Sequence, residues 1–250
     1  IPDSGEVLFN GEKLNQKNII NIGYLPEERG LYRKMKIGNQ AMYLAQLKGL
    51  SKKEAKDRLD YWFDKFEISN WWNKKIEDLS KGMAQKIQFI TTVLHEPKLL
   101  IFDEPFSGLD PVNAALIRDE ILRIRDDGAT IVLSTHRMES VEELCTHIAL
   151  LNNGEKIIDG SVNDIKESHR DGNFRLIYRS DKVINLSIPN EVHLVQNNAD
   201  IKKGVFIAEL QSQKQSASQI IKNLSSQVDT ISFEEIIPSI NDIFIKSVKK

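Results

Sequence analysis

Two short apolar runs, separated by one amphipathic segment, place the strongest constraint on the fold of this chain. The runs are "KLLIF" (98–102) and "TIVLST" (130–135), and neither alternates with polar residues. Short continuous apolar runs are typical of strands that are covered on both faces of a parallel sheet. Between them, Asp110–Pro111 opens a predicted helix. Its inner face carries Leu116, Ile117, Ile121 and Ile124. This order of strand, helix and strand predicts an α/β fold.

The residues before these runs extend the same pattern. "EVLF" followed by Asn10–Gly11 predicts a strand that enters a hairpin turn. "IINIGYL" (19–25) predicts a second strand, which Pro26 ends. From Ile37 to about Trp72, apolar residues recur at helical spacing within a highly charged segment.

The pattern changes towards the end of the chain. "HIALLNNGEKIID" predicts a hairpin that turns at Asn153–Gly154. The short alternating segments "FRLIY", "VINLSI" and "GVFIAEL" then predict strands, with a helix near 216–224 and a final strand and helix. We expect one domain at 1–165 and a separate small α+β domain at 168–250. The last helix, 240–248, is expected to close the core of this second domain.

Composition excludes several classes of protein. The chain has 250 residues, of which 40% are apolar and 28% are charged, as in ordinary globular proteins. Its net charge of -2 offers no electrostatic reason to expect nucleic-acid binding. A single cysteine, Cys145, excludes an internal disulfide framework and suits a reducing compartment. No apolar run is long enough to cross a bilayer, so another chain would have to supply any membrane part.

The first apolar run ends in two adjacent carboxylates, Asp103 and Glu104. Like charges repel, and burying either carboxylate without a partner is costly, so a cation is expected beside them. Parallel sheets bind ligands at the carboxyl ends of their strands. An aspartate in this place would hold Mg²⁺ on a bound nucleotide, and the next glutamate could act as a general base. The alternative is a strand whose terminal acids simply face solvent.

Two further polar features accompany these carboxylates. Ser80 stands where a helix N-cap is expected, and Gly82 follows in the first turn, so free backbone N–H groups could meet an anion there. His136 follows the second apolar run, at the carboxyl end of that strand. Alternatively, the helix is only a capped amphipathic helix and the histidine is structural.

The order and spacing of these pieces resemble those of the ATP-binding-cassette (ABC) ATPases. "LSKGM" resembles the signature motif, "LLIFDEP" the Walker B strand with its catalytic glutamate, "SGLD" the D-loop, "STH" the switch histidine and "IGYLPEERGLY" the Q-loop segment. The resemblance covers roughly residues 1–165. It implies a P-loop NTPase-like core that uses ATP and Mg²⁺, with a helical subdomain at about 37–78. With its C-terminal domain, the chain looks most like exporters of the sodium- and drug-efflux group.

The resemblance implies a role for each matching residue. Asp103 would hold Mg²⁺, Glu104 would activate water, and His136 would contact the γ-phosphate of ATP. Ser80 and Gly82 would contact the γ-phosphate of a nucleotide that a partner subunit holds.

At other matched positions, the residue either has a second, structural role or differs from the residue that the family usually has. Asp110 would communicate across the dimer interface, and it also stands where an N-cap is expected before Pro111. Glu27 stands where the family usually has glutamine, so a carboxylate replaces a neutral amide near metal and water, where metal contact remains possible. Lys81 and Met83 replace the common glycine and glutamine of the signature motif.

One motif of the family is missing from the printed residues. They contain no G-x-x-x-x-G-K-[ST], and therefore no phosphate-binding loop or Walker lysine. "IPDSGEVLFNGE" resembles the piece that follows the Walker A helix, so we expect the chain to be truncated at the N-terminus of the domain. We further expect these residues alone to be inactive as an ATPase.

Partners follow from the same resemblance. An integral membrane permease subunit and a second ATP-binding subunit are expected, with no nucleic acid, at the cytoplasmic face of the cell membrane. Candidate contacts to the permease are Arg29, Tyr32, Met35 and the pair Trp71–Trp72. Two alternatives remain open at this stage: a soluble ABC ATPase that does not transport, and a non-catalytic regulatory or dimerisation module.

Overall fold

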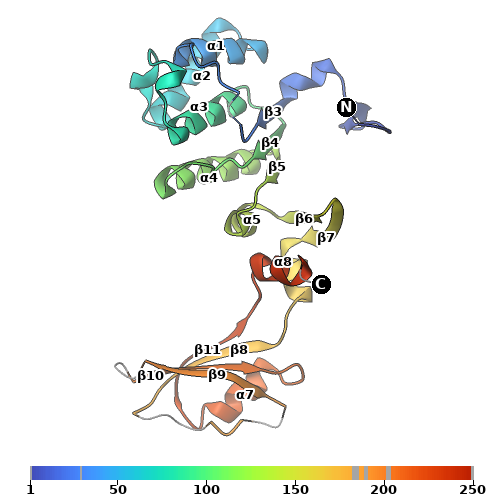
Figure 1. Cartoon of the computed structure of the whole chain (residues 1–250), viewed down its shortest axis with the longest axis vertical. Coiled ribbons are helices and arrows are strands. Elements are labelled where there is room, and N and C mark those ends of the chain that lie inside the picture. The colour runs from blue at the N-terminus through green and yellow to red at the C-terminus, as the bar shows by residue number, and fades with distance from the viewer. Residues whose placement is uncertain (1, 29, 182–185, 189–190, 201–203, 249–250) are drawn as a thin grey trace. The chain divides into compact units, whose positions relative to one another are not determined.

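The structure is a computed structural model that describes residues 2–28, 30–181, 186–188, 191–200 and 204–248. The chain divides into two compact units, Ile1–Arg137 and Met138–Lys250. Figure 1 shows their helices and strands, coloured from blue at the N-terminus to red at the C-terminus. The boundary that the sequence places at 165–168 stays a prediction.

A parallel sheet lies at the centre of the first unit. Its order is β3 (Ile22–Leu25), β4 (Leu99–Asp103) and β5 (Thr130–Ser134), and both pairings are parallel. The register places Asp103 opposite Ser134, so β4 and β5 end at the same edge. The prediction of parallel strands is confirmed. The expected burial of both faces is wrong for β5, where Val132 is 50% exposed, because β5 is an edge strand of this sheet.

The segment before β3 differs from its prediction. Asn10 and Gly11 form the expected hairpin turn, with positive φ angles of 52° and 80°, between β1 (Leu8–Phe9) and β2 (Glu12–Lys13). However, the first half of "IINIGYL" is not extended. A short helix, η1 (Gln16–Asn21), begins at Asn15, whose side chain accepts the Lys17 N–H at 2.9 Å. This local cap outweighs the strand preference of the two isoleucines.

Several helices pack beside the sheet in the first unit. They are α1 (Ile37–Leu47), α2 (Lys52–Lys65), η2 (Ser69–Trp71), η3 (Ile76–Asp78), α3 (Lys81–Val93) and α4 (Pro111–Asp126). The predicted helical character of 37–72 is confirmed. A capping box of Ser51 and Glu54 begins α2, as this pair of residues at this spacing favours.

A cluster of aromatic rings joins these helices to the sheet. The ring of Phe89 on α3 lies 6.2 Å from that of Trp62, 5.9 Å from that of Phe66 and 5.8 Å from that of Phe102, between ring centroids. Phe66, Phe89 and Phe102 are almost completely buried. Since Phe102 belongs to β4, this cluster connects the helical region to the strand that carries Asp103.

The second unit begins with two short helices and a hairpin. These elements are α5 (Met138–Leu144), β6 (His147–Asn152), β7 (Glu155–Ser161) and α6 (Val162–Ser168). The hairpin turns at Asn153 and Gly154, whose φ angles of 49° and 82° are the left-handed values that the predicted turn requires.

An antiparallel sheet follows in the second unit. Its order is β11 (Asp229–Ile236), β8 (Asn173–Arg179), β10 (Val205–Gln211) and β9 (His193–Asp200). The helix α7 (Ala217–Leu224) buries Ile220 and Leu224 in the core of this sheet. The strand predicted for "VINLSI" is wrong for 186–188, which form no strand, and its first three residues lie outside the described ones.

The last helix packs differently from its prediction. Helix α8 (Ile240–Val248) buries Ile240 and Ile243 against Val162 and Ile165, not in the core of the antiparallel sheet. The Glu142 carboxylate accepts the Ile240 N–H at 2.6 Å. It also forms an ion pair with Lys166, whose Nζ lies 2.5 Å from the carboxylate. The apolar stripe of α8 therefore finds its partners in residues 138–165, and the expectation that it closes the sheet's core is wrong.

His95 lies between α3 and β4 and is partly buried in the first unit. Its Nε2 lies 3.3 Å from the carbonyl oxygen of Ile22, which also accepts the Lys48 Nζ at 2.8 Å. Burial first, and then the charge of Lys48, lowers the pKa of His95 to about 4 from an ordinary value of 6.5. Between these values the unfolded chain binds a proton that the folded chain does not.

We therefore expect the free energy of unfolding to fall as the pH decreases from 6.5 to 4. The expected loss from His95 is about 1–2 kcal/mol, because solvent reaches part of the ring and screens the effect. Urea unfolding followed by fluorescence measures this in the first unit, which holds Trp62, Trp71 and Trp72. The variant His95→Gln should show a smaller decrease, and an equal decrease in both proteins would contradict this assignment.

Candidate active site

Two carboxylates lie at the carboxyl edge of the parallel sheet, as the sequence predicts. Asp103 is the last residue of β4 and is half-buried. Glu104 follows it, is 8% exposed, and has a φ angle of 46°, which is uncommon for a residue other than glycine. Its backbone N–H donates to the Ser134 carbonyl at 2.9 Å. This bond between the ends of β4 and β5 orients the backbone of Glu104.

The end of β5 binds the Glu104 side chain. Oε1 accepts the backbone N–H of His136 at 2.7 Å and lies 2.7 Å from its ring Nδ1. Oε2 accepts the Thr135 hydroxyl at 3.2 Å. An ionised carboxylate can only accept, so the His136 ring must carry its proton on Nδ1. The structure thus brings Glu104 and His136 together, with 85% of the histidine side chain exposed.

The amino end of α3 presents the predicted helix terminus. The Ser80 hydroxyl accepts the Met83 N–H at 3.3 Å, so the N-cap is confirmed. Gly82 lies close to the segment after Glu104, because a Cβ on it would be 2.9 Å from the Gly108 carbonyl oxygen. A side chain would not fit there without a shift of backbone, which gives this glycine a packing reason.

Asp110 caps α4. Its carboxylate accepts the N–H groups of Val112 at 3.1 Å and Asn113 at 3.0 Å. The bond from the Asn113 N–H, with a second from the Asn113 side chain, lowers the pKa of this exposed carboxyl group. The capping role is therefore present, and communication between subunits remains a prediction for this residue.

The part of the Q-loop segment after β3, residues 26–32, begins at the same edge of the sheet. Glu27 is exposed, and Arg29 lies outside the described residues. Tyr32 is exposed, while its N–H donates to the Gln40 side chain at 3.1 Å.

The tryptophan pair has internal packing partners. Trp72 packs with Phe63 at 5.5 Å between ring centroids and covers Gly38. Trp71 has Lys74 over its ring at 5.4 Å. Since Trp72 is engaged within the helical region, Tyr32 is the better candidate for an external contact.

Sequence reasoning missed two polar residues of this edge. Thr135, directly before His136, bonds the Glu104 carboxylate. Gln85 on α3 is buried and donates its side-chain N–H to the Pro105 carbonyl at 2.9 Å. The position of Thr135 in the chain, directly before His136 at the end of the second apolar run, could have identified it. No local pattern identifies Gln85, because its partner belongs to another element.

The donor groups at this edge fit magnesium only together with another ligand. Within the described residues, no three His, Cys, Asp or Glu side chains gather in a way that could hold a metal ion. Mg²⁺ usually binds one or two carboxylates together with phosphate oxygens and water. Asp103 supplies such an oxygen donor, so this edge fits Mg²⁺ that arrives with a nucleotide.

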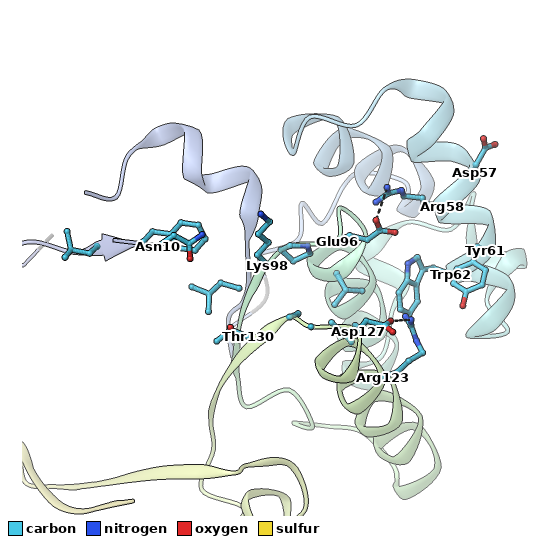
Figure 2. A pocket seen from close by; sticks show the side chains of 18 residues that line it. Asn10, Asp57, Arg58, Tyr61, Trp62, Glu96, Lys98, Arg123, Asp127 and Thr130 are labelled. Carbon is cyan, nitrogen blue, oxygen red and sulfur yellow. Dashed lines mark hydrogen bonds and ion pairs between the residues drawn. The ribbon is translucent and has the colours of Figure 1, made fainter. Parts of the chain in front are cut away.

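A separate hollow opens at the opposite end of the sheet (Figure 2). Leu99 and Thr130, the first residues of β4 and β5, line it. Its charged walls include the ion pairs of Arg58 with Glu96 at 3.2 Å and Arg123 with Asp127 at 2.7 Å. Because Asp103 and Glu104 follow the other end of β4, this hollow is not the candidate site.

No helix of the described residues combines the length and the apolar character that a membrane span needs.

Comparison with known families gives two matches. Residues 1–107 match the family "ABC transporter", and residues 160–248 match the family "ATP-binding protein DrrA1-3-like, C-terminal domain".

Individual proteins extend these matches. An ABC transporter ATP-binding protein of Alkalihalophilus pseudofirmus is 40% identical over 99% of this chain and 90% of its own length. The Nod factor export ATP-binding protein I of a Rhizobium species is 27% identical over 68% of this chain and 57% of its own length. A solved structure, titled as the ATP-binding subunit of an ABC transporter, has a TM-score of 0.61 and 31% identity. That match covers 67% of this chain and 71% of the other.

Proposed function

Because this chain belongs to the family of ABC transporter ATP-binding proteins, we propose that it is the ATP-hydrolysing subunit of an exporter. Members of this family generally hydrolyse ATP with Mg²⁺. The observation that carries the proposal is the pairing of Glu104 with His136 beside Asp103, at the carboxyl edge of the sheet.

Glu104 is the proposed general base. A carboxylate has about four acceptor positions, of which His136 occupies two on Oε1 and Thr135 one on Oε2. The remaining position on Oε2 is then available to a water molecule. Glu104 would orient that water and accept its proton as the water attacks the γ-phosphate.

His136 and Asp103 are assigned the roles that the resemblance implies. A His136 ring that donates through Nδ1 to Glu104 has Nε2 at its other edge, and Nε2 would contact the γ-phosphate. Donation through both ring nitrogens requires the imidazolium form. Asp103 would hold Mg²⁺, which supplies charge neutralisation on the phosphates when it is bound.

The amino end of α3 is proposed to serve a second subunit. Ser80 and Gly82 would contact the nucleotide that the partner ATP-binding subunit holds, since a helix N-terminus attracts phosphate. A helix dipole favours an anion there whichever subunit supplies it. Glu27 would lie near the metal and water, and Asp110 would pass information across the dimer.

Export through a membrane permease subunit is the finer part of the proposal. It is supported by the likeness to a relative named for Nod factor export. The exposed Tyr32, in the Q-loop segment, is the proposed contact with the permease. This arrangement would place the chain on the cytoplasmic face of the membrane.

The test of this function is co-expression of this chain, extended upstream by a phosphate-binding loop segment of a relative, with a candidate membrane protein from the neighbouring genes. We expect the two proteins to purify together, and the assembly to hydrolyse ATP faster than the ATP-binding protein alone. Association with ribosomes or DNA, without any membrane protein, would favour a non-transport ATPase instead.

A further prediction concerns the 250-residue chain by itself. The phosphate-binding loop and Walker lysine supply much of the binding free energy of a triphosphate, and the printed residues contain neither. We expect calorimetry with Mg-ATP to show no micromolar binding and assays to show no appreciable hydrolysis. The matched control is the same chain with a phosphate-binding loop segment of a relative added upstream, which should bind. Micromolar binding by the chain alone would contradict the prediction.

A further inference from the structure

Gln85 connects helix α3 to the turn that carries Glu104. Only 2% of this residue is exposed. Its Nε2 donates to the Pro105 carbonyl at 2.9 Å and lies 3.5 Å from the Glu104 carbonyl. A buried amide that bonds the backbone of another element holds that backbone in place, because breaking the bond leaves polar groups unpaired away from water.

The Glu104 turn needs such support. A φ angle of 46° is sparsely populated for residues with a side chain, and it persists only where neighbouring groups determine it. The Glu104 N–H bonds the Ser134 carbonyl at 2.9 Å, and the Ser107 N–H bonds the Glu104 carbonyl at 3.0 Å. Those two bonds come from the neighbouring strand and from the turn itself. The Gln85 bond adds the constraint from α3.

A second contact joins the same two elements. A Cβ on Gly82 would be 2.9 Å from the Gly108 carbonyl oxygen, and the Lys81 side chain covers Gly108. The first two turns of α3 and the segment after Glu104 therefore touch at two places, at Gln85 with Pro105 and at Gly82 with Gly108. A displacement of the amino end of α3 is then transmitted to the turn.

We propose that Gln85 is a positioning residue for ATP hydrolysis, which sets the place of the Glu104 carboxylate from the amino end of α3. The inference rests on the proposed function, in which Glu104 is the base. The contact is indirect, since Gln85 bonds backbone carbonyls and not the reacting atoms. A small misplacement of a catalytic group is sufficient to slow a reaction strongly, so the loss of one such bond should be measurable.

The chain offers a matched pair of variants. Gln85→Met keeps the approximate length and volume of the side chain but removes the N–H donor. Gln88→Met makes the same change one turn later on α3, where the buried amide has no hydrogen-bond partner within the described part of the chain. A difference between the two variants therefore reports the Pro105 bond and not the general effect of replacing a buried glutamine.

Hydrogen exchange tests the structural half of the proposal in the 250-residue chain, without nucleotide. We expect Gln85→Met to accelerate exchange in 104–109 by about fivefold or more, the effect of losing roughly one hydrogen bond. Exchange in β4 should stay the same, as should exchange in both regions of Gln88→Met. Unchanged exchange at 104–109 in Gln85→Met would overturn the proposal.

Kinetics test the functional half in the chain that carries the added phosphate-binding loop segment, assembled with its membrane partner. Gln85→Met should lower kcat by about tenfold or more and change KM for Mg-ATP by less than about twofold, as expected for a group that acts only in the transition state. Faster exchange with an unchanged kcat would overturn the positioning role. Normal hydrolysis by Glu104→Gln would instead reject the base assignment of the proposed function, so the two failures are distinguishable.

Discussion

Replacing Glu104 by glutamine should slow ATP hydrolysis by roughly 10²–10⁴-fold, the usual contribution of a general base. The amide keeps the shape of the side chain. Its oxygen can still accept from the His136 N–H and Nδ1, and its NH₂ group can face the Thr135 hydroxyl, which rotates to accept. Only the negative charge and the basicity are lost.

Binding of Mg-ATP should survive this change, because Asp103 is untouched. We expect Glu104→Gln to bind Mg-ATP with an affinity close to that of the parent and to accumulate as an ATP-bound dimer of ATP-binding subunits. Calorimetry with Mg-ATP measures the affinity, size-exclusion chromatography measures the dimer, and single-turnover assays measure the slower hydrolysis. All three use the chain with the added phosphate-binding loop segment.

The matched control is Glu139→Gln, which changes an exposed glutamate shortly after His136. This variant should hydrolyse ATP at the parent rate. If Glu104→Gln also turned over at the parent rate, Glu104 would not be the base, and the function would need another residue to activate water.

Replacing Phe89 by alanine should have the largest effect on stability. Phe89 is fully buried, and its ring lies among those of Trp62, Phe66 and Phe102. The loss of a buried phenylalanine side chain destabilises proteins by about 3–5 kcal/mol, because it removes burial and leaves a cavity. Collapse of this cavity is limited here, since its walls are rigid rings from α2, the end of α2 and β4.

A loss of this size is a large part of the total stability of a domain, which is about 5–15 kcal/mol. Urea unfolding followed by circular dichroism measures it. Tyr43→Ala is the matched control, because Tyr43 is an aromatic residue on α1 that is 45% exposed. The control should change the free energy of unfolding by about 1 kcal/mol or less. Equal effects of the two substitutions would show that the aromatic cluster does not hold the helical region on β4.

Much of the local structure followed from residues that are neighbours in the chain. Asp110 before Pro111 predicts an N-cap, and the structure has one; Asn153–Gly154 predicts a hairpin turn, and both residues have positive φ. The capping of α3 by Ser80 is of the same kind. These features depend on groups within a few residues of each other, so a sequence pattern contains all of their partners.

The placement of the candidate site could be predicted in part. Two apolar runs that end in polar residues indicate parallel strands, and parallel strands bring their carboxyl ends to one edge. Glu104 and His136 therefore had to be near each other. Their direct bond, and the bond of Thr135 to the same carboxylate, depend on a left-handed backbone at Glu104 that the residue type itself disfavours.

By itself, the sequence determined most of the helices and strands, with 19–21 and 186–188 as exceptions, and it placed several caps and turns and the two strand ends that meet at the edge of the sheet. Tertiary structure decided which partner each buried face takes. Periodicity shows that Ile240 and Ile243 are buried, but only the fold places them against Val162 and Ile165. Likewise, nothing near Gln85 in the chain indicates its bond to Pro105. The physical reason is that apolar burial is non-directional, so the choice between distant partners depends on how whole elements fit together.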